Sequence, residues 1–172
     1  ATPENYQELQ DNLLNEFGKL DGLVHNASIL GTQMPIEQYD IKLWYSTIQI
    51  NLNAPFMLTQ FLIPALLKSD DARIIFLSST VGRKARAYWG AYSVSKFGIE
   101  GFAKTLSEEL EKTQISVNTV NPGKLRTEMR RTAYPAEDSS TVPLPEEKSQ
   151  AIVHLLSSSS PKINGEQLTI SD

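Results

Sequence analysis

Hydrophobic and polar residues follow two distinct patterns along the chain. Four short runs resemble buried strands, and the first two are almost continuously apolar, as a parallel sheet covered on both faces requires. These runs lie at 22–25, 73–77, 115–120 and 167–170. The segments between them repeat their apolar residues every three to four positions, as one side of a helix does. The pattern therefore predicts strands that alternate with helices.

Four segments have the periodicity of helices. They cover residues 3–17, 41–68, 91–112 and 146–156, and the second is expected to bend near 51–55. Thr2 can cap the first helix, and Pro3 suits its first position because proline lacks the N–H group that a first turn leaves unbonded. The expected inward stripes are Leu9, Leu13, Leu14 and Phe17 in the first helix and Ile99, Phe102, Ala103, Leu106 and Leu110 in the third.

This alternation predicts an α/β fold with a doubly wound parallel sheet, in a single domain of 172 residues. A composition of 40% hydrophobic and 21% charged residues excludes the disordered, collagen-like and coiled-coil classes. The chain has no cysteine, so disulfides, thiolate zinc sites and cysteine nucleophiles are excluded. A net charge of -4 argues against a nucleic-acid partner, and the most apolar stretch, 54–67, is too short to cross a membrane.

Ligands of open parallel sheets bind beyond the carboxyl ends of the strands. The first three predicted strands are followed there by turns at 25–28, 78–82 and 121–123, each of which is polar or contains glycine. Such turns follow strands in many proteins, so one alone is weak evidence. Three at the same edge favour a binding site.

The segment 92–96 adds a chemical pair. Tyr92 and Lys96 lie four residues apart, which on a helix places the phenol and the ammonium on one side. Such pairs also arise by chance on solvated surfaces, and this pair gains its value from Ser79, which ends a predicted strand shortly upstream. We expect Lys96 to lower the pKa of Tyr92, whose ordinary value is near 10, and Ser79 to hold a carbonyl or alcohol oxygen. This site moves protons but supplies no hydride, so a nicotinamide cofactor is its natural partner.

Five motifs occur in a characteristic order: HNAS at 25–28, INLNA at 50–54, SST at 78–80, AYSVSK at 91–96 and NPGKLRT at 121–127. Together they resemble the short-chain dehydrogenase/reductase family, over essentially the whole chain, and within it bacterial oxidoreductases of the YciK type. The resemblance implies a Rossmann-like fold and an enzyme that uses NAD or NADP to transfer hydride between nicotinamide and an alcohol or carbonyl substrate.

The resemblance also implies roles for individual residues. Tyr92 would be the general acid/base, Lys96 would hold the nicotinamide ribose, Ser79 would orient the substrate oxygen and Asn51 would anchor a water in the proton relay. The implied cofactor-binding residues are Asn26, Ala27, Ser28, Tyr92, Lys96, Pro122, Gly123 and Thr127. No metal ligand is expected.

The chain departs from the family pattern in three ways. Ser28 stands where glycine is usual, and its side chain is expected to restrict the approach of the cofactor. His25 is interpreted as a packing residue. The family's first strand, Gly-rich phosphate turn and NAD/NADP-selecting residue are missing, and the chain begins at Ala1 rather than Met. We therefore expect residues 1–172 to be the C-terminal two-thirds of an NAD(P)-binding domain.

Basic residues flank the predicted site of this acidic protein. They are either a solvated rim or a binding surface for a phosphate or carboxylate on the substrate or cofactor. In the second case, Arg83 and Arg130 would select anionic substrates. The residues are Arg83, Lys84, Arg86, Arg126, Arg130 and Arg131.

A stripe of Val94, Gly98, Gly101 and Thr105 either lets its helix lie close on the sheet or, as the resemblance implies, belongs to a subunit interface of a homodimer or homotetramer. The expected partner is a small alcohol or carbonyl compound, and the expected location is cytoplasmic. Two alternatives remain: a truncated, non-catalytic remnant that acts as a structural or interaction domain, or another Rossmann-like enzyme such as a methyltransferase.

Overall fold

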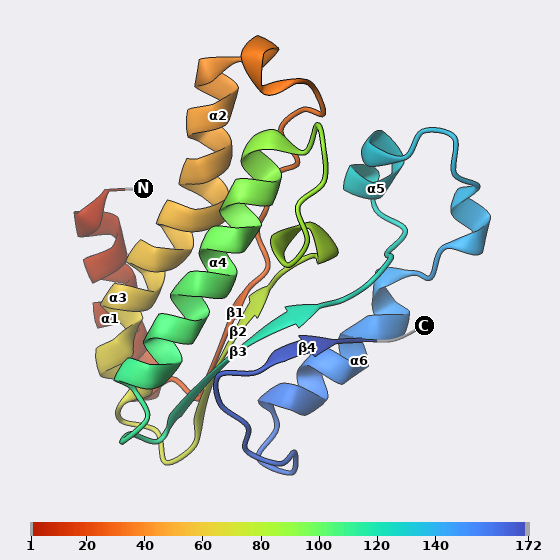
Figure 1. The fold of residues 1–172 in the computed structure, drawn as a ribbon. Helices are drawn as coiled ribbons and strands as arrows, with labels where there is room; N and C mark the ends of the chain where they lie inside the picture. Colours follow the sequence, from red (N-terminus) through yellow and green to blue (C-terminus); the bar gives the residue numbers. More distant parts are fainter. Residues whose placement is uncertain (1, 171–172) are drawn as a thin grey trace.

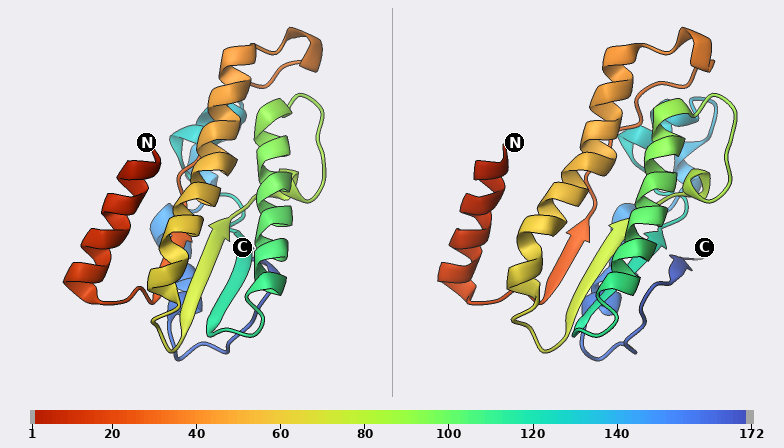
Figure 2. Two further views of the ribbon diagram at one scale, coloured as in Figure 1. Left: turned by 90° about the vertical axis from the view of Figure 1, so that its left-hand side faces the viewer. Right: turned by 60° about the vertical axis from the view of Figure 1, so that its left-hand side comes forward.

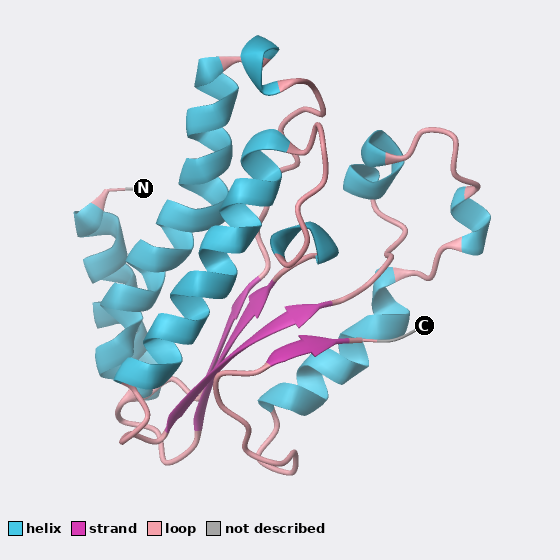
Figure 3. Cartoon of the chain, in the orientation of Figure 1, coloured by secondary structure: helices cyan, strands magenta, loops and turns pink. Residues whose placement is uncertain are grey.

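The computed structural model describes residues 2–170 and has the predicted alternation of strands and helices. Figure 3 shows one sheet of parallel strands flanked by helices. The strands lie side by side in the order β1-β2-β3-β4, and each neighbouring pair is parallel. Their bounds are β1 Gly22–His25, β2 Ala72–Leu77, β3 Ile115–Asn121 and β4 Gln167–Thr169.

The register of the sheet brings the predicted site together. His25, the last residue of β1, pairs with Phe76, and Leu77, the last residue of β2, pairs with Val120 near the end of β3. The chain therefore leaves these three strands at the same edge of the sheet. The turns that were predicted to carry the chemistry follow at that edge.

One face of the sheet is covered by α1 (Pro3–Phe17), by α2 (Ile41–Ile48) with its continuation α3 (Ala54–Leu66), and by α4 (Gly90–Glu109). Figure 2 shows α1, α3 and α4 on this face and the blue C-terminal helix behind the sheet. The predicted stripe of α4 packs on the strands, with Phe102 only partly buried. The core between helices and sheet comprises Leu62, Leu66, Ala72, Ile74, Phe76, Ile99, Ala103, Leu106, Leu110, Ile115 and Val117.

The opposite face carries α6 (Pro145–Leu156), which makes the sheet doubly wound (Figure 1). Gly22 allows this helix to come close, because a Cβ atom there would lie 3.3 Å from Leu156 Cδ2. Buried Arg73 donates from Nη1 to the Leu155 carbonyl over 3.1 Å. This arginine satisfies a carbonyl at the C-terminal end of α6 and so ties the helix to β2.

The predicted bend in the long second helix is a turn of π-helix, η2 (Gln49–Asn53), between α2 and α3. Pro55 lies in the first turn of α3, where a missing N–H costs little. Asn51 lies in the middle of the π-turn and is only 2% exposed. The bend thus directs a polar side chain into the protein.

The inward face of α1 was partly predicted wrongly. Leu9 is 41% and Phe17 63% exposed, whereas Tyr6 and Gln10 are buried. Tyr6 stacks on Phe61 of α3 with ring centroids 5.8 Å apart. α1 lies at the edge of the helical layer and packs mainly against α3 rather than over the centre of the sheet. The face of α1 that is buried is therefore determined by α3.

Residues 128–141, for which the pattern predicts neither helix nor strand, contain α5 (Glu128–Ala133) and the short η4 (Ser139–Thr141). Both begin at a capping side chain: Thr127 Oγ1 accepts from the Arg130 N–H over 3.1 Å, and Asp138 Oδ1 accepts from the Ser140 N–H over 2.9 Å. Elements this short have little hydrophobic periodicity, which explains why the pattern did not reveal them.

The small-residue stripe of α4 faces away from the sheet, so the prediction that it lets α4 approach the sheet is wrong. Val94 is exposed, and a Cβ at Gly101 would have no neighbour within 4 Å. Only Gly98 is closely packed, against Leu52 of η2, where a Cβ would lie 2.7 Å from Leu52 Cδ2. Among residues 2–170, no helix is long and apolar enough to cross a membrane.

Candidate active site

The carboxyl edge of the sheet holds a cavity of about 400 Å³. Its walls come from the turns after β1, β2 and β3, the first turns of α4, and the segment through α5. Every predicted site residue except Asn51 lines it. These lining residues are Asn26, Ala27, Ser28, Ser79, Tyr92, Lys96, Pro122, Gly123 and Thr127.

Tyr92 and Lys96 project from the first turns of α4 toward the end of β2. Lys96 Nζ donates a 2.7 Å hydrogen bond to the Leu77 carbonyl and lies 5.6 Å from the centre of the Tyr92 ring. Gly82 makes this packing possible, because a Cβ there would lie 2.8 Å from Lys96 Cβ. The four-residue spacing therefore places the phenol and the ammonium on one side of the helix, as predicted.

Burial controls the protonation of both groups. Burial raises the pKa of Tyr92, and an interaction with the Ser79 hydroxyl acts in the opposite direction. Burial also lowers the pKa of the Lys96 ammonium to about 8, although the nearby Glu100 carboxylate works against it. The pKa of Tyr92 is therefore raised and not lowered as expected from the nearby Lys96, because loss of solvation is the dominant cause.

Ser79 stands at the junction of β2 and η3 (Thr80–Gly82), directly after the last strand residues. Its backbone is extended, and its hydroxyl accepts a long hydrogen bond of 3.5 Å from the Val81 N–H. A serine at the start of this short helix satisfies a backbone donor and keeps its hydroxyl in the cavity wall. The hydroxyl proton is left for another acceptor.

Asn121 joins two of the turns. Its Nδ2 donates to Thr80 Oγ1 over 3.2 Å, and its Oδ1 accepts from the Gly123 N–H over 3.1 Å. Gly123 has a φ of 75°, a conformation that favours glycine. These bonds hold the Pro122–Gly123 turn beside Ser79.

Asn51 lies outside the cavity wall and clamps the segment after β1. Its Oδ1 accepts from the Ile29 N–H and its Nδ2 donates to the Ile29 carbonyl, both over 2.8 Å. The second Nδ2 proton goes to Ser95 Oγ over 3.1 Å. The side chain has thus used both of its donors and retains one acceptor position on Oδ1.

Two hydroxyls in the cavity lining have no hydrogen-bond partner. Ser28 Oγ and Ser78 Oγ, in the turns that follow β1 and β2, are both buried and unpartnered. An unsatisfied buried hydroxyl costs about 1–3 kcal/mol. Unsatisfied polar groups of this kind fit a site whose wall meets a polar ligand, such as a nucleotide cofactor.

Comparison with known proteins identifies the family. The family described as short chain dehydrogenase matches residues 1–138. The chain belongs to the short chain dehydrogenases. It is 44% identical over 145 residues to the uncharacterized oxidoreductase YciK of Escherichia coli K12, a match that covers 84% of this chain and 57% of YciK. The chain thus spans just over half of that relative.

Solved structures agree with this assignment. A Pseudomonas syringae protein classed as a short chain dehydrogenase is 48% identical, with a TM-score of 0.95, over 98% of this chain and 69% of its own. A Shigella flexneri protein of the same class, complexed with NADP, is 40% identical, with a TM-score of 0.94, over 98% and 70%. The Rossmann fold and the YciK-type likeness expected from the motifs are confirmed.

His25, the last residue of β1, is a packing residue, as predicted. Its ring stacks on Phe76 with centroids 4.5 Å apart and planes 10° apart, and its Nε2 lies 2.8 Å from Thr59 Oγ1. Burial lowers its pKa to about 4. A neutral, stacked imidazole of this kind supports the end of β1 beneath the cavity.

The predicted basic surface of this chain is largely occupied by internal contacts. Arg83 pairs with buried Glu100 over 2.7 Å and also donates to Thr169 and Leu168 of β4. Arg130 makes two bonds of 2.6 and 2.7 Å to Glu137. Arg83 therefore fastens β4 to α4, and the carboxylate partners of Arg83 and Arg130 favour a structural role for both arginines over anion binding. Arg126 and Arg131 are likewise engaged, with Val142 and Glu128.

Motif reasoning missed an aromatic wall of the cavity. Trp89 and Tyr134 both line it, with ring centroids 5.9 Å apart, and Trp89 lies 5.8 Å from the ring of Tyr92. Trp89 immediately precedes α4, and its position three residues before Tyr92 could have indicated from the sequence that it lies at the site. Tyr134 follows α5, which had no sequence signal. Among the described residues, no cluster of His, Cys, Asp or Glu could hold a metal ion.

Proposed function

We propose that this chain carries the catalytic residues of an NAD(P)-dependent oxidoreductase that interconverts alcohols and carbonyl compounds. The observation that carries the proposal is that Ser79, Tyr92 and Lys96 line one cavity at the carboxyl edge of the sheet. A hydroxyl, a phenol and an ammonium at that place suit proton transfer to a carbonyl oxygen. Membership of the short chain dehydrogenases supports the same reaction class.

Tyr92 is the proposed general acid/base. Because burial raises its pKa, the phenol is protonated at neutral pH and can donate its proton to a carbonyl oxygen as that oxygen gains charge. The Ser79 hydroxyl donates a hydrogen bond to the same oxygen and holds it beside the phenol. Lys96 stabilises the phenolate that remains.

The proposed cofactor is NADP or NAD. When bound, the nicotinamide supplies the hydride for carbonyl reduction and accepts it in the reverse direction. Residues at the ends of β1 and β3 would hold the cofactor, and Lys96 would donate to its ribose. The NADP complex of the Shigella relative supports this cofactor class. The proposed binding residues are Asn26, Ala27, Ser28, Tyr92, Lys96, Pro122, Gly123 and Thr127.

Asn51 is proposed to anchor a water that returns a proton toward Lys96. Its free Oδ1 acceptor position is the place where such a water would donate. Its remaining bonds keep the backbone of Ile29 fixed beside the cavity. Asn51 would therefore contribute to both the relay and the shape of the site.

The chain is further proposed to form the C-terminal two-thirds of an NAD(P)-binding domain, which agrees with its coverage of 69% of the Pseudomonas structure. A homodimer or homotetramer in the cytoplasm completes the proposal. The outer side of α2, α3 and α4 exposes apolar side chains suited to a subunit interface. These are Ile41, Tyr45, Phe56, Val94 and Phe97.

A hydride-transfer experiment tests the reaction class. The full-length protein is incubated with NADPH deuterated at the transferable position and with a panel of ketones and aldehydes, and the alcohols are analysed by mass spectrometry. We expect one deuterium on the carbon that was the carbonyl. Cofactor binding without any labelled alcohol from a broad panel would instead favour a non-catalytic role.

A further inference from the structure

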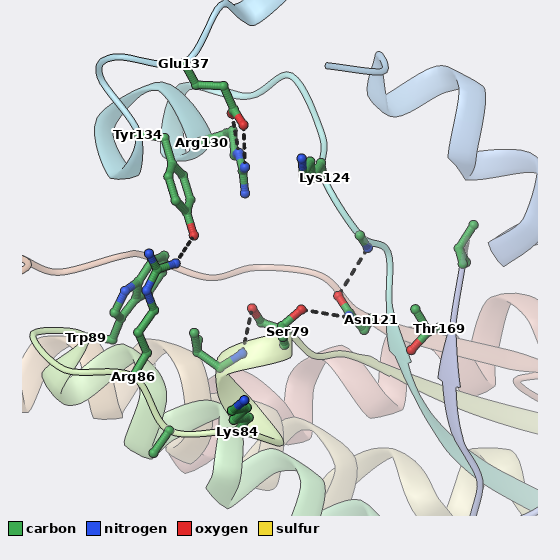
Figure 4. A pocket seen from close by; sticks show the side chains of 15 residues that line it. Ser79, Lys84, Arg86, Trp89, Asn121, Lys124, Arg130, Tyr134, Glu137 and Thr169 are labelled. Carbon is green, nitrogen blue, oxygen red and sulfur yellow. Dashed lines mark hydrogen bonds and ion pairs between the residues drawn. The ribbon is translucent and has the colours of Figure 1, made fainter. Parts of the chain in front are cut away.

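The candidate active site continues into a second, larger cavity of about 720 Å³ (Figure 4). This outer cavity is lined by the segment after η3, by the turn after β3, by α5 and the residues that follow it, and by the end of β4. Ser79 and Asn121 line both cavities, so a ligand can extend from one into the other. The other shared lining residues are Trp89, Gly123, Arg130 and Tyr134.

The outer cavity is rich in positive charge. Lys84 and Arg86 reach it from one side and Lys124 from the other, as Figure 4 shows around Ser79. Within residues 2–170, none of these three makes a salt bridge. Glu137 is the cavity's carboxylate, and Arg130 engages both of its oxygens. The cavity therefore has an excess of cations, although the whole chain has a net charge of -4.

Arg86 is already held in place. Its Nη1 donates to the Tyr134 hydroxyl over 2.8 Å. Its guanidinium lies 5.8 Å from the centre of the Trp89 ring and 5.6 Å from that of Tyr134. Only one of its five N–H donors is engaged in these contacts, so the others remain for a ligand. An arginine positioned in this way loses less conformational freedom when it binds an anion.

We propose that the outer cavity binds the anionic group of the substrate, so that the enzyme acts on oxo or hydroxy compounds that carry a carboxylate or a phosphate. The reacting carbonyl would lie at Ser79 and Tyr92, and the anion would lie against Lys84, Arg86 and Lys124. Cations in a concave site attract an anion more strongly than cations on an open surface. This inference rests on the proposed function and gives its substrate class.

Matched substrate pairs provide the first test. 4-Oxopentanoate is compared with its methyl ester, and dihydroxyacetone phosphate with dihydroxyacetone, so that carboxylate and phosphate are distinguished. In each pair that the enzyme turns over, we expect kcat/KM to be at least about tenfold higher for the charged compound than for the neutral one. Charge-assisted hydrogen bonds would give a difference of this size. The preference should shrink in high salt. Equal kcat/KM values within both pairs would overturn the inference.

A triple variant, Lys84→Gln with Arg86→Gln and Lys124→Gln, locates the preference. It should lose at least about tenfold in kcat/KM for the charged compound and little for the neutral one. The matched control is Lys68→Gln, an exposed lysine after α3 at the other edge of the sheet. A triple variant that keeps the full preference would also overturn the inference.

A binding experiment separates this inference from the proposed function. The Tyr92→Phe variant is titrated calorimetrically with the same acid and phosphate, with and without the triple substitution. If the triple substitution weakens this binding, the result supports the outer cavity as the anion site. That support holds even if the wild type turns over no substrate, and in that case only the proposed function fails. Turnover of neutral carbonyls without anion binding leaves the proposed function and refutes the anionic subsite.

Discussion

The ammonium of Lys96 lies 5.6 Å from the centre of the Tyr92 ring, and both residues are almost completely buried. Burial keeps the Tyr92 phenol protonated, and burial also lowers the pKa of the Lys96 ammonium to about 8. At neutral pH the pair thus holds a proton on each group. That is the protonation state in which Tyr92 can act as an acid toward a carbonyl oxygen.

The pH dependence of carbonyl reduction should reflect Lys96. As the pH rises through about 8, Lys96 loses its charge, so kcat/KM for the cofactor, which reports the free enzyme, should fall. Glu100 raises the pKa of Lys96, and Glu100→Gln should therefore move this decline to lower pH. The matched control, Glu108→Gln, removes an exposed carboxylate of the same helix and should leave the profile unchanged. A decline at the same pH in both variants would exclude Glu100 as a positioning residue.

Lys96 should reduce the stability of the fold. Lowering its pKa from 10.5 to about 8 corresponds to a cost of about 3 kcal/mol at neutral pH. Lys96→Met removes this cost but also the bond to the Leu77 carbonyl, worth about 1 kcal/mol, so the free energy of unfolding should rise by about 1–2 kcal/mol. Activity should fall at the same time. Urea unfolding at pH 7 measures the difference, and a less stable Lys96→Met variant would contradict it.

His25 should make the fold sensitive to acid. Its pKa is about 4 in the folded protein and near 6.5 when exposed, so the unfolded chain binds its proton more readily. The free energy of unfolding should therefore fall as the pH is lowered from 6.5 to 4, by about 3 kcal/mol in total from this residue. His25→Gln, which cannot titrate, should show a flatter pH dependence in denaturant unfolding. Identical curves for the two proteins would show that His25 is not the responsible group.

Arg83 should be important for stability rather than for substrate charge. Arg83→Ala leaves the buried carboxylate of Glu100 without its cation, which should cost about 3 kcal/mol. Arg131→Ala breaks an exposed pair with Glu128 and should cost less than about 1 kcal/mol. Thermal unfolding of both variants compares the two. A selective loss of activity toward anionic substrates in Arg83→Ala, without loss of stability, would restore the original interpretation of this residue.

Hydrophobic pattern and motif spacing were sufficient for much of this molecule. The four strands, the bend near Asn51 and the stripe of α4 follow from periodicity, because each is long or buried enough to have a pattern. Motif order also placed Ser79, Tyr92 and Lys96 in one cavity, since parallel strands bring their ends to one edge.

The remaining features depend on contacts between distant residues. The side of α1 that is buried is set by α3, and the role of Arg83 is set by Glu100 and β4. The pKa of Tyr92 depends on its burial, which spacing alone cannot give. The aromatic wall of Trp89 and Tyr134 needs α5, an element held by the cap at Thr127 and too short to show periodicity.

The most direct test of the central claim is the Tyr92→Phe variant of the full-length protein. Cofactor binding is measured by calorimetry and carbonyl reduction by cofactor absorbance, with Tyr88→Phe, an exposed tyrosine, as the matched control. We expect Tyr92→Phe to bind NADPH as the wild type does and to lose at least about 100-fold in kcat, because the proton donor is gone. Tyr88→Phe should retain full activity. A Tyr92→Phe variant with wild-type turnover would contradict the account.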